Sequence, residues 1–304
     1  MKRRLTFGPV LIALLLGLMW LDQWLATQSA PKSLSLLTTQ DGRWQPGLIL
    51  VFIGLLACGR AGYELSRMYQ AAGIQASAKS LTFCAASGLL AGVLTIGPLA
   101  PLHDIGAEVL GSAAGLALFL TMLAYIRDRD LKGAGGAVAA AVLAFVYVGV
   151  MLGFLMALRR EHSVWLMVMM ILTVKACDSG AYFVGSAIGR HKLIPWVSPG
   201  KTWEGLIGGV LTSAACGVGL AALGQQWGAL VSWARLGLVG GGVLGLLLGI
   251  FGQLGDLSAS VLKRDAGIKD AGRILPGFGG LVDMLDSLLI TAPLTYWYLA
   301  SVRG

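Results

Sequence analysis

The chain has 304 residues, of which 56% are hydrophobic and 12% are charged, and its formal net charge is +8. With a mean hydropathy of +0.77, this composition excludes an ordinary soluble domain and favours an all-α, polytopic integral membrane protein. The basic excess is typical of cytoplasmic loops that face anionic membrane lipids. Without interleaved aromatic residues, it gives no indication of a nucleic-acid partner.

Apolar runs predict about nine transmembrane helices along the chain. The first run follows Lys2, Arg3 and Arg4 and extends to about Trp24, which is long enough to span a bilayer. We therefore interpret it as a retained anchor rather than a cleaved signal peptide. The remaining runs lie at about residues 47–65, 80–98, 107–126, 134–157, 163–188, 203–223, 235–255 and 287–302.

The basic residues predict which side of the membrane each loop faces. When the amino terminus is placed in the cytoplasm, most lysines and arginines of the loops fall on the cytoplasmic side, as the positive-inside rule requires. Arg159 and Arg160 are exceptions to this pattern. We expect a multi-pass protein of the inner (cell) membrane whose functional loops face the cytoplasm.

The sixth run carries two ionisable residues, Lys175 and Asp178, inside a predicted span. Charged groups within a membrane are costly, and they usually line a cavity or pair with each other. One interpretation is a structural ion pair, since residues three apart share a helix face. The other interpretation places Asp178 in a polar cavity.

A polar segment follows this run, with the sequence Ser198-Pro199-Gly200-Lys201-Thr202. It contains the Gly-Lys-Thr of a phosphate-binding P-loop, but the first glycine of that motif and the preceding strand are missing. We expect a Pro-Gly turn that leads into a helix, where free backbone N–H groups and the lysine attract an anion. The alternative is an ordinary capped helix start, with the lysine at the lipid headgroups.

The eighth run contains regularly spaced glycines, Gly237, Gly241, Gly245 and Gly249. On a helix, this spacing forms a smooth ridge on which a second helix can pack closely. The pattern fits either a packing seam within the chain or the face of a homodimer.

The segment from Gln253 to Ser287 concentrates charge between two apolar runs. Its acidic residues suit Mg²⁺, which usually links carboxylates to substrate phosphates, and its lysines and arginines suit the phosphates themselves. Asp283 and Asp286 share one face if they open a helix. Pro-Gly and Gly-Gly pairs just before them allow the backbone to approach a ligand closely.

Residue by residue, this segment resembles the signature of the phosphatidate cytidylyltransferases, or CDP-diacylglycerol synthases. The matching positions are Ser260, Lys263, Arg264, Lys269, Asp270, residues 276–280, Asp283 and Asp286. The Asp-x-Gly-Ala-Tyr string that begins at Asp178 and the Ser-Pro-Gly-Lys-Thr segment are similar to the same family. Phe278 and Met284 depart from the pattern, because the family usually has His and Arg there, so no role of that His or Arg is carried over.

The resemblance implies an enzyme of phospholipid biosynthesis that transfers CMP from CTP to phosphatidate, giving CDP-diacylglycerol and pyrophosphate. It implies dependence on Mg²⁺, with a second monovalent or divalent cation as an option. It also implies a catalytic part at residues 161–304 that follows a transmembrane helical part at residues 1–160. The implied site residues are Asp256, Asp283 and Lys263 for catalysis; Asp256, Asp283, Asp286 and Asp178 as metal ligands; and Ser198, Lys201, Ser260, Arg264, Lys269 and Asp270 for substrate binding.

Three alternatives stay open. The same chemistry on another lipid phosphate is the first. A transporter that uses Lys175 and Asp178 as an ion relay is the second, although such a protein would spread its charges along several spans. A catalytically inactive relative is the third, because of Phe278 and Met284. The main hypothesis requires Asp256 and Asp283 to share one pocket at the inner leaflet.

Overall fold

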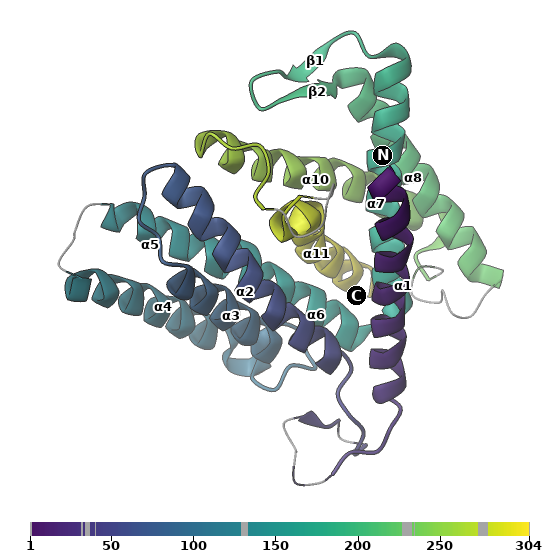
Figure 1. The fold of residues 1–304 in the computed structure, drawn as a ribbon. Coiled ribbons are helices and arrows are strands. Elements are labelled where there is room, and N and C mark those ends of the chain that lie inside the picture. The colour runs from purple at the N-terminus through teal and green to yellow at the C-terminus, as the bar shows by residue number, and fades with distance from the viewer. Residues whose placement is uncertain are drawn as a thin grey trace. The chain divides into compact units, whose positions relative to one another are not determined.

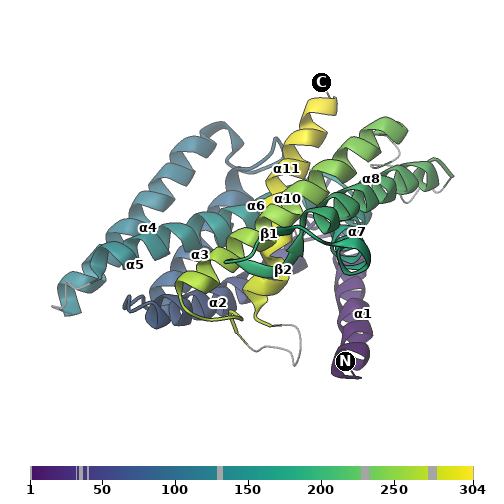
Figure 2. The same cartoon turned by 90° about the horizontal axis from the view of Figure 1, so that it is seen from above.

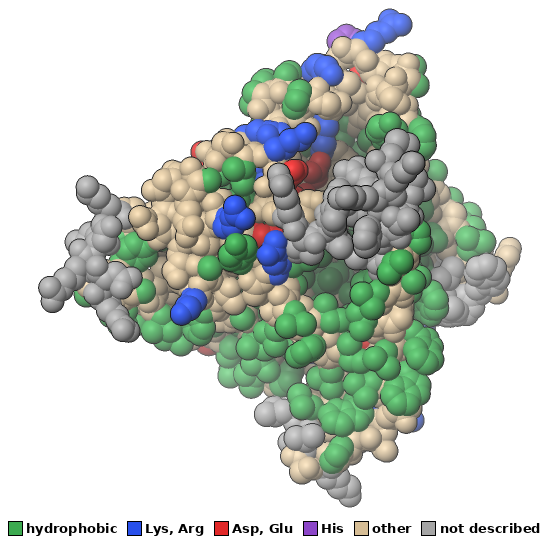
Figure 3. Space-filling model, in the orientation of Figure 1, with side chains coloured by type: hydrophobic (Ala, Val, Ile, Leu, Met, Phe, Trp, Pro, Cys, Tyr) green, Lys and Arg blue, Asp and Glu red, His purple; other side chains and the backbone are tan. Residues whose placement is uncertain are grey.

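The computed structural model of this protein describes residues 2–31, 33, 37–39, 41–128, 133–226, 233, 235–272 and 279–303, without the side chains of residues 2–8, 11, 127, 128 and 303. These residues form long helices and one small hairpin (Figure 1), which confirms the predicted all-α class. Hydrophobic side chains cover much of the visible helix surface (Figure 3), and many of the large ones are exposed, as expected for helices that face lipid.

Helices occur at every apolar run that the sequence predicts. The elements are α1 (Lys2–Leu25), α2 (Leu48–Ala71), α3 (Ala78–Thr95), α4 (Gly106–Asp128), α5 (Ala134–Leu143), α6 (Met151–Glu161), α7 (Val164–Ile188), β1 (Lys192–Ile194), β2 (Ser198–Thr202), α8 (Trp203–Gln226), α10 (Gly237–Asp265) and α11 (Leu281–Arg303). A π-helical stretch, Ala144–Val150, joins α5 and α6 into one continuous helix.

Seven helical segments in the described part of the chain are long and apolar enough to cross a membrane. Helices α1 and α11 are not among them, so the predicted count of nine spans stays a prediction. The chain is nonetheless polytopic, because several spans of this length cannot be accommodated in a soluble fold of this composition.

The chain packs as two compact units. The first unit contains residues Met1–Val164 and Ala266–Met284, and the second contains Trp165–Asp265 and Leu285–Gly304. The chain therefore passes from the second unit into the first after α10 and returns within α11.

Close helix packing in the first unit depends on glycines. Helix α3 lies beside α6 in both views (Figures 1 and 2). A Cβ atom on Gly153 would lie 2.8 Å from Cα of Gly92, and one on Gly149 would lie 2.8 Å from Cα of Gly88. Larger residues at these positions would therefore push the two helices apart.

A buried ion pair in the first unit joins α1 to α6. Arg159 Nε lies 2.7 Å from Asp22 Oδ2, and both side chains are almost fully buried. The Asp22 carboxylate also accepts hydrogen bonds from the backbone N–H groups of Gly47 and Ile49 at the start of α2. This pairing gives a physical reason why Arg159 departs from the positive-inside pattern, since its charge is neutralised within the protein.

In the second unit, α8 and α10 pack through the predicted glycine ridge. A Cβ atom on Gly245 would lie 2.5 Å from the carbonyl oxygen of Ser213, and one on Gly249 would lie 3.0 Å from Cβ of the same serine. Gly241 also faces α8, whereas Gly237 has open space around it and a positive φ of 67°. The ridge is thus an internal packing seam at three of its four positions.

The Ser-Pro-Gly-Lys-Thr segment differs from its expected structure. Instead of a Pro-Gly turn, Pro199 and Gly200 belong to strand β2, which pairs with β1 in an antiparallel hairpin before α8 starts at Trp203. Proline is tolerated here because a two-stranded hairpin has only edge strands. The first turn of α8 is capped internally, since Thr202 Oγ1 accepts a hydrogen bond from the N–H of Gly205. The predicted Pro-Gly turn is therefore wrong, whereas the anion-binding role of the segment stays a prediction.

Replacing Asp22 with alanine should destabilise the protein strongly. The change leaves Arg159 as a buried, uncompensated charge and removes the acceptor for two N–H groups, so we expect the free energy of unfolding to fall by about 3–5 kcal/mol. Unfolding of the detergent-solubilised protein measures the change. The control is Asp41→Ala in an exposed loop, which should shift stability by less than about 0.5 kcal/mol. Equal stability of the two variants would contradict the assigned role of the ion pair.

Candidate active site

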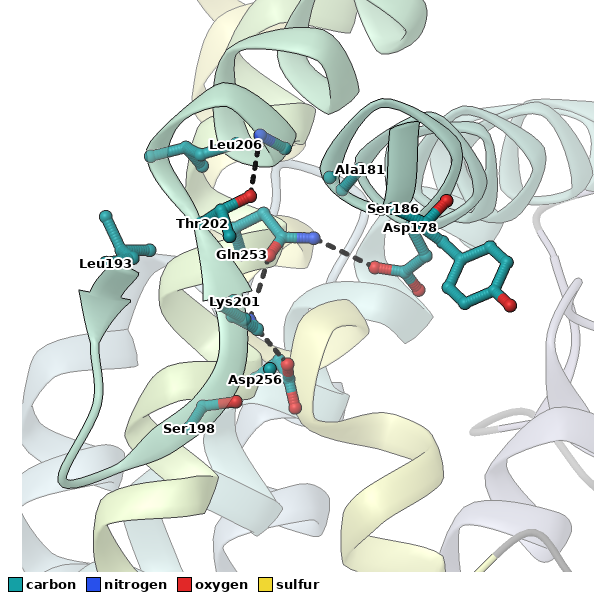
Figure 4. A pocket seen from close by; sticks show the side chains of 14 residues that line it. Asp178, Ala181, Ser186, Leu193, Ser198, Lys201, Thr202, Leu206, Gln253 and Asp256 are labelled. Carbon is teal, nitrogen blue, oxygen red and sulfur yellow. Dashed lines mark hydrogen bonds and ion pairs between the residues drawn. The ribbon is translucent and has the colours of Figure 1, made fainter. Parts of the chain in front are cut away.

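A polar pocket of about 440 Å³ lies in the second unit, between α7, the β1–β2 hairpin, α8 and α10. Four of the residues predicted for the site line this pocket: Asp178, Ser198, Lys201 and Asp256. Figure 4 shows them approaching the pocket from three separate stretches of the chain. The structure therefore brings together residues from all three sequence segments that carry the resemblance, on α7, on β2 and on α10.

Lys201 is the central cation of the pocket. Its Nζ atom lies 2.6 Å from Asp256 Oδ2 and donates a hydrogen bond of 2.8 Å to Oε1 of Gln253. The amide of Gln253 in turn donates to Asp178 Oδ1 at 3.0 Å (Figure 4). These contacts orient Lys201. They also link the carboxylates of Asp178 and Asp256 through Gln253 and Lys201.

The two interpretations of Lys175 and Asp178 both apply. Lys175 Nζ lies 2.8 Å from Asp178 Oδ2, so the predicted i, i+3 ion pair exists. The other carboxylate oxygen of Asp178 binds Gln253, and the aspartate lines the polar pocket. Asp178 is therefore a structural partner and a pocket residue at the same time.

Asp286 and Lys263 extend this cluster around Asp256. The Asp286 carboxyl group interacts with that of Asp256, and Lys263 interacts electrostatically with both. Asp286 is buried, with Oδ1 accepting hydrogen bonds from the backbone N–H and the hydroxyl of Ser287. The close approach of α10 and α11 requires Gly255, where a Cβ atom would lie 2.6 Å from the carbonyl oxygen of Asp286. Two carboxylates and two lysines are thus held together in the second unit.

This donor set fits a magnesium ion. Mg²⁺ is usually bound by one or two carboxylates, with water and substrate phosphates as its other ligands, and Asp256 and Asp286 supply that number. The Asp256 side chain is 35% exposed, which leaves it accessible from the pocket. No group of three His, Cys, Asp or Glu side chains suited to a metal occurs among the described residues, so a complete all-protein cage is not present in that part of the chain.

The remaining predicted residues of α10 have different surroundings. Ser260 is buried on α10, on the same helix face as Asp256 and Lys263. Arg264 donates a hydrogen bond of 3.0 Å from Nε to the carbonyl oxygen of Val197, which attaches the end of α10 to the hairpin. Arg264 therefore supports the hairpin that carries Lys201.

Several predicted residues belong to the first unit. Lys269 and Asp270 are exposed, and Asp283 Oδ2 accepts hydrogen bonds from the N–H groups of Ala271 and Gly280, at 3.0 and 2.8 Å. Asp256 belongs to the second unit, so the predicted meeting of Asp256 and Asp283 stays a prediction.

Part of the signature falls outside the described residues, namely Pro276, Gly277 and Phe278. Met284, the other departure from the family pattern, lies in the first turns of α11.

Gln253 links Lys201 to Asp178, a role that its sequence context does not predict. An uncharged amide carries no motif signal of its own. Helical spacing is the one sequence feature that could have identified it. Gln253 lies three residues before Asp256 on α10, on the helix face shared with Ser260 and Lys263.

Glu64 on α2 is a buried acid of the first unit that the sequence analysis also missed. Its side chain is 0% exposed, and its two oxygens accept hydrogen bonds of 3.0 Å from the N–H groups of Leu281 and Val282. Arg60 Nε lies 2.9 Å from Oε1. The carboxylate therefore caps the N-terminus of α11, where the helix dipole favours negative charge. Because Asp283 lies in the same turn, Glu64 fixes the start of the helix that carries it.

Two glycines give the Glu64 carboxylate its space. A Cβ atom on Gly272 would lie 2.6 Å from Oε1, and one on Gly280 would lie 2.6 Å from Oε2. No side chain fits at either position unless the carboxylate moves. Gly280 belongs to the Gly-Gly pair of the signature. Its lack of a side chain is therefore explained by the space that the Glu64 carboxylate needs, and not only by the backbone freedom of glycine.

Replacing Glu64 with alanine should weaken the start of α11. The change leaves two backbone N–H groups and Arg60 without their acceptor, and we expect the free energy of unfolding to fall by about 3 kcal/mol. Glu64→Gln keeps one acceptor oxygen and should recover part of the loss. Chemical unfolding in detergent measures both variants. The control is Glu108→Ala, which removes an exposed acid from the first turn of α4 and should change stability little; a similar loss in both alanine variants would refute the capping role.

Comparison with known proteins agrees with the geometry of the pocket. Residues 37–302 match the model of the cytidylyltransferase family. The phosphatidate cytidylyltransferase of Staphylococcus aureus (strain COL) is 34% identical over 215 residues, which cover 70% of this chain and 79% of that protein. The enzymes of the same name from Bacillus subtilis (strain 168) and Haemophilus influenzae are each 38% identical, over 160 and 138 residues.

The matches to the last two relatives are shorter. They cover 52% and 45% of this chain, and 56% and 46% of the Bacillus and Haemophilus proteins, so the chain spans about half the length of these two relatives. The family match includes every residue of the polar pocket and of the Asp256 cluster. The chain belongs to the cytidylyltransferase family.

Proposed function

We propose that this protein transfers CMP from CTP to phosphatidate, producing CDP-diacylglycerol and pyrophosphate for phospholipid biosynthesis. The observation that carries the proposal is the polar pocket, in which Lys201 faces Asp256 while Asp286 and Lys263 extend the same charged cluster. Reactions at phosphorus depend mainly on positioning and on neutralising phosphate charge. A pocket with a lysine and two carboxylates, next to a second lysine and a third carboxylate, suits that demand, and the names of the relatives support the choice of substrates.

The proposed reaction is a displacement at the α-phosphorus of CTP. An oxygen of the phosphatidate phosphate forms the new bond to this phosphorus, the bond to the bridging oxygen of the β-phosphate breaks, and pyrophosphate leaves with that oxygen. The attacking phosphate is already ionised, so no side chain has to remove a proton from it. The protein's task is to align the two substrates and to offset their negative charge.

Each pocket residue has a role in this proposal. Lys201 and Lys263 attract phosphate oxygens, and Ser198 and Ser260 donate hydrogen bonds to them. Gln253 holds the Lys201 ammonium group in position. Arg264 supports the hairpin, while Lys269 and Asp270 are kept as substrate contacts on the basis of the motif alone.

We propose that Asp256 and Asp286 hold Mg²⁺, with Asp178 and Asp283 as further candidate ligands and a second cation as an option. An ion held by these carboxylates would offset the negative charge of the nucleotide phosphates. We also propose that the pocket faces the cytoplasm, because the positive-inside pattern places both motif-bearing loops on that side, where CTP is present.

Asp256→Asn should lower the rate of pyrophosphate release by about 100-fold or more, since it removes a proposed metal ligand and the partner of Lys201. The assay combines CTP, Mg²⁺ and phosphatidate in detergent or proteoliposomes. Asp265→Asn, at the exposed last residue of the same helix, is the control and should retain activity. Asp283→Ala tests the motif-based assignment separately. Full activity of the Asp256 variant would exclude the proposed role, and faster turnover with another lipid phosphate would change the substrate.

Removal of Mg²⁺ should abolish pyrophosphate release, and readdition should restore it. Asp286→Asn should then raise the Mg²⁺ concentration needed for half-maximal rate by about tenfold or more, because one of two carboxylates is lost. A titration of rate against Mg²⁺ at fixed CTP measures this shift. If the chelated protein stays active, or if the variant has an unchanged Mg²⁺ dependence, the proposed ion site is wrong.

A further inference from the structure

An apolar groove of about 450 Å³ lies next to the polar pocket in the second unit. Its walls come from strand β1 and from helices α8 and α10. Apart from Gln253, all of its lining residues are apolar, among them Ile207, Leu211 and Leu254. A volume of this size falls in the range of sites that bind small molecules.

The groove and the polar pocket share a border. Leu193, Leu206 and Gln253 line both of them. The amide of Gln253 is bound to Lys201 and Asp178 on the polar side, so the character of the surface changes from charged to apolar at this one residue. A molecule that occupies both spaces must therefore have a charged end and an apolar end.

The groove is also open to the outside of the helices. Ile207 is 57% exposed, Leu211 62% and Leu254 48%, although all three belong to helices apolar enough to span a membrane. Helices α8 and α10, which form two of its walls, are held close together by the glycine seam. In a bilayer, such a groove is accessible from the lipid side without passage through water.

We propose that this groove holds one acyl chain of the lipid substrate while the phosphate of the same molecule enters the polar pocket. The proposal rests on the proposed function and deepens it. A lipid tail in the bilayer is already in apolar surroundings, so burial in the groove adds little hydrophobic free energy. The contribution of the groove is positional, because a held tail directs the phosphate toward Lys201 and limits the ways in which the lipid can approach.

Photo-cross-linking tests the proposal without any need for turnover. The intact protein in liposomes is exposed to phosphatidate that carries a diazirine in one acyl chain, and labelled residues are identified by mass spectrometry. Phosphatidylcholine with the same chains and diazirine is the matched probe for ordinary bilayer contact. We expect phosphatidate to label residues 203–211 and 250–257 several-fold more than phosphatidylcholine does, and unlabelled phosphatidate to compete. Equal labelling by the two probes would show general lipid contact and would overturn the proposal.

Variants of the groove provide the second measurement. Leu211→Trp fills the groove and should reduce phosphatidate labelling by about threefold or more and raise the KM for phosphatidate, with the KM for CTP unchanged. Leu223→Trp is the control, since it is exposed on the same helix and does not line the groove. Ile207→Ala, which enlarges the groove, replaces the first variant if that one does not fold. An unchanged lipid KM together with unchanged labelling refutes the role of the groove.

The two proposals fail in different ways. If CTP is not consumed but phosphatidate still labels the groove selectively, the groove stands and the proposed reaction is wrong. If pyrophosphate is released normally while the labels fall elsewhere, the reaction stands and the groove is not the site of the acyl chain.

Discussion

The contact between Lys201 and Asp256 is the interaction on which the site depends. The carboxylate of Asp256 lies close to that of Asp286, and two like charges at short range repel each other unless cations offset them. Lys201 at 2.6 Å and Lys263 supply those cations, and Gln253 prevents the first lysine from turning away. The arrangement keeps two carboxylates together in a partly buried place, which is the condition for holding a divalent cation beside phosphate groups.

This arrangement is possible because helix backbones approach one another closely. Gly245 and Gly249 allow α8, which directly follows the lysine-bearing strand, to lie against α10, and Gly255 allows α11 to bring Asp286 to Asp256. Small residues serve this purpose in membrane proteins, where helices gain little from the hydrophobic effect and associate through close packing instead. Other residues of the same two helices line the apolar groove. The glycines therefore position both the charged and the apolar part of the proposed lipid site.

Hydropathy alone located the helices, because a span needs a long apolar run, and motif residues identified Asp178, Lys201 and Asp256 as pocket residues. Local sequence patterns did not predict the features that depend on contacts between residues far apart in the sequence. The hairpin was missed, because Pro-Gly is typical of turns and only pairing with β1 makes it a strand. Glu64 was missed because its partner Leu281 is 217 residues away, and no local spacing reports such a contact. Gln253 carries no charge, so its role depends wholly on the lysine and the aspartate that it bridges.

The charges of the cluster suit the proposed binding of a cation and of phosphate anions at one site. Three carboxylates, those of Asp178, Asp256 and Asp286, accompany three ammonium groups, those of Lys175, Lys201 and Lys263. A balanced cluster avoids the cost of a large unpaired charge near the membrane. In the proposed function, phosphate oxygens would compete with the carboxylates for the ammonium groups, and the carboxylates released in this way would hold the divalent cation. A site with only lysines would bind the nucleotide without the metal ion, and a site with only aspartates would repel the nucleotide. The mixed cluster couples the two, so binding of the metal and of the phosphates should each favour the other.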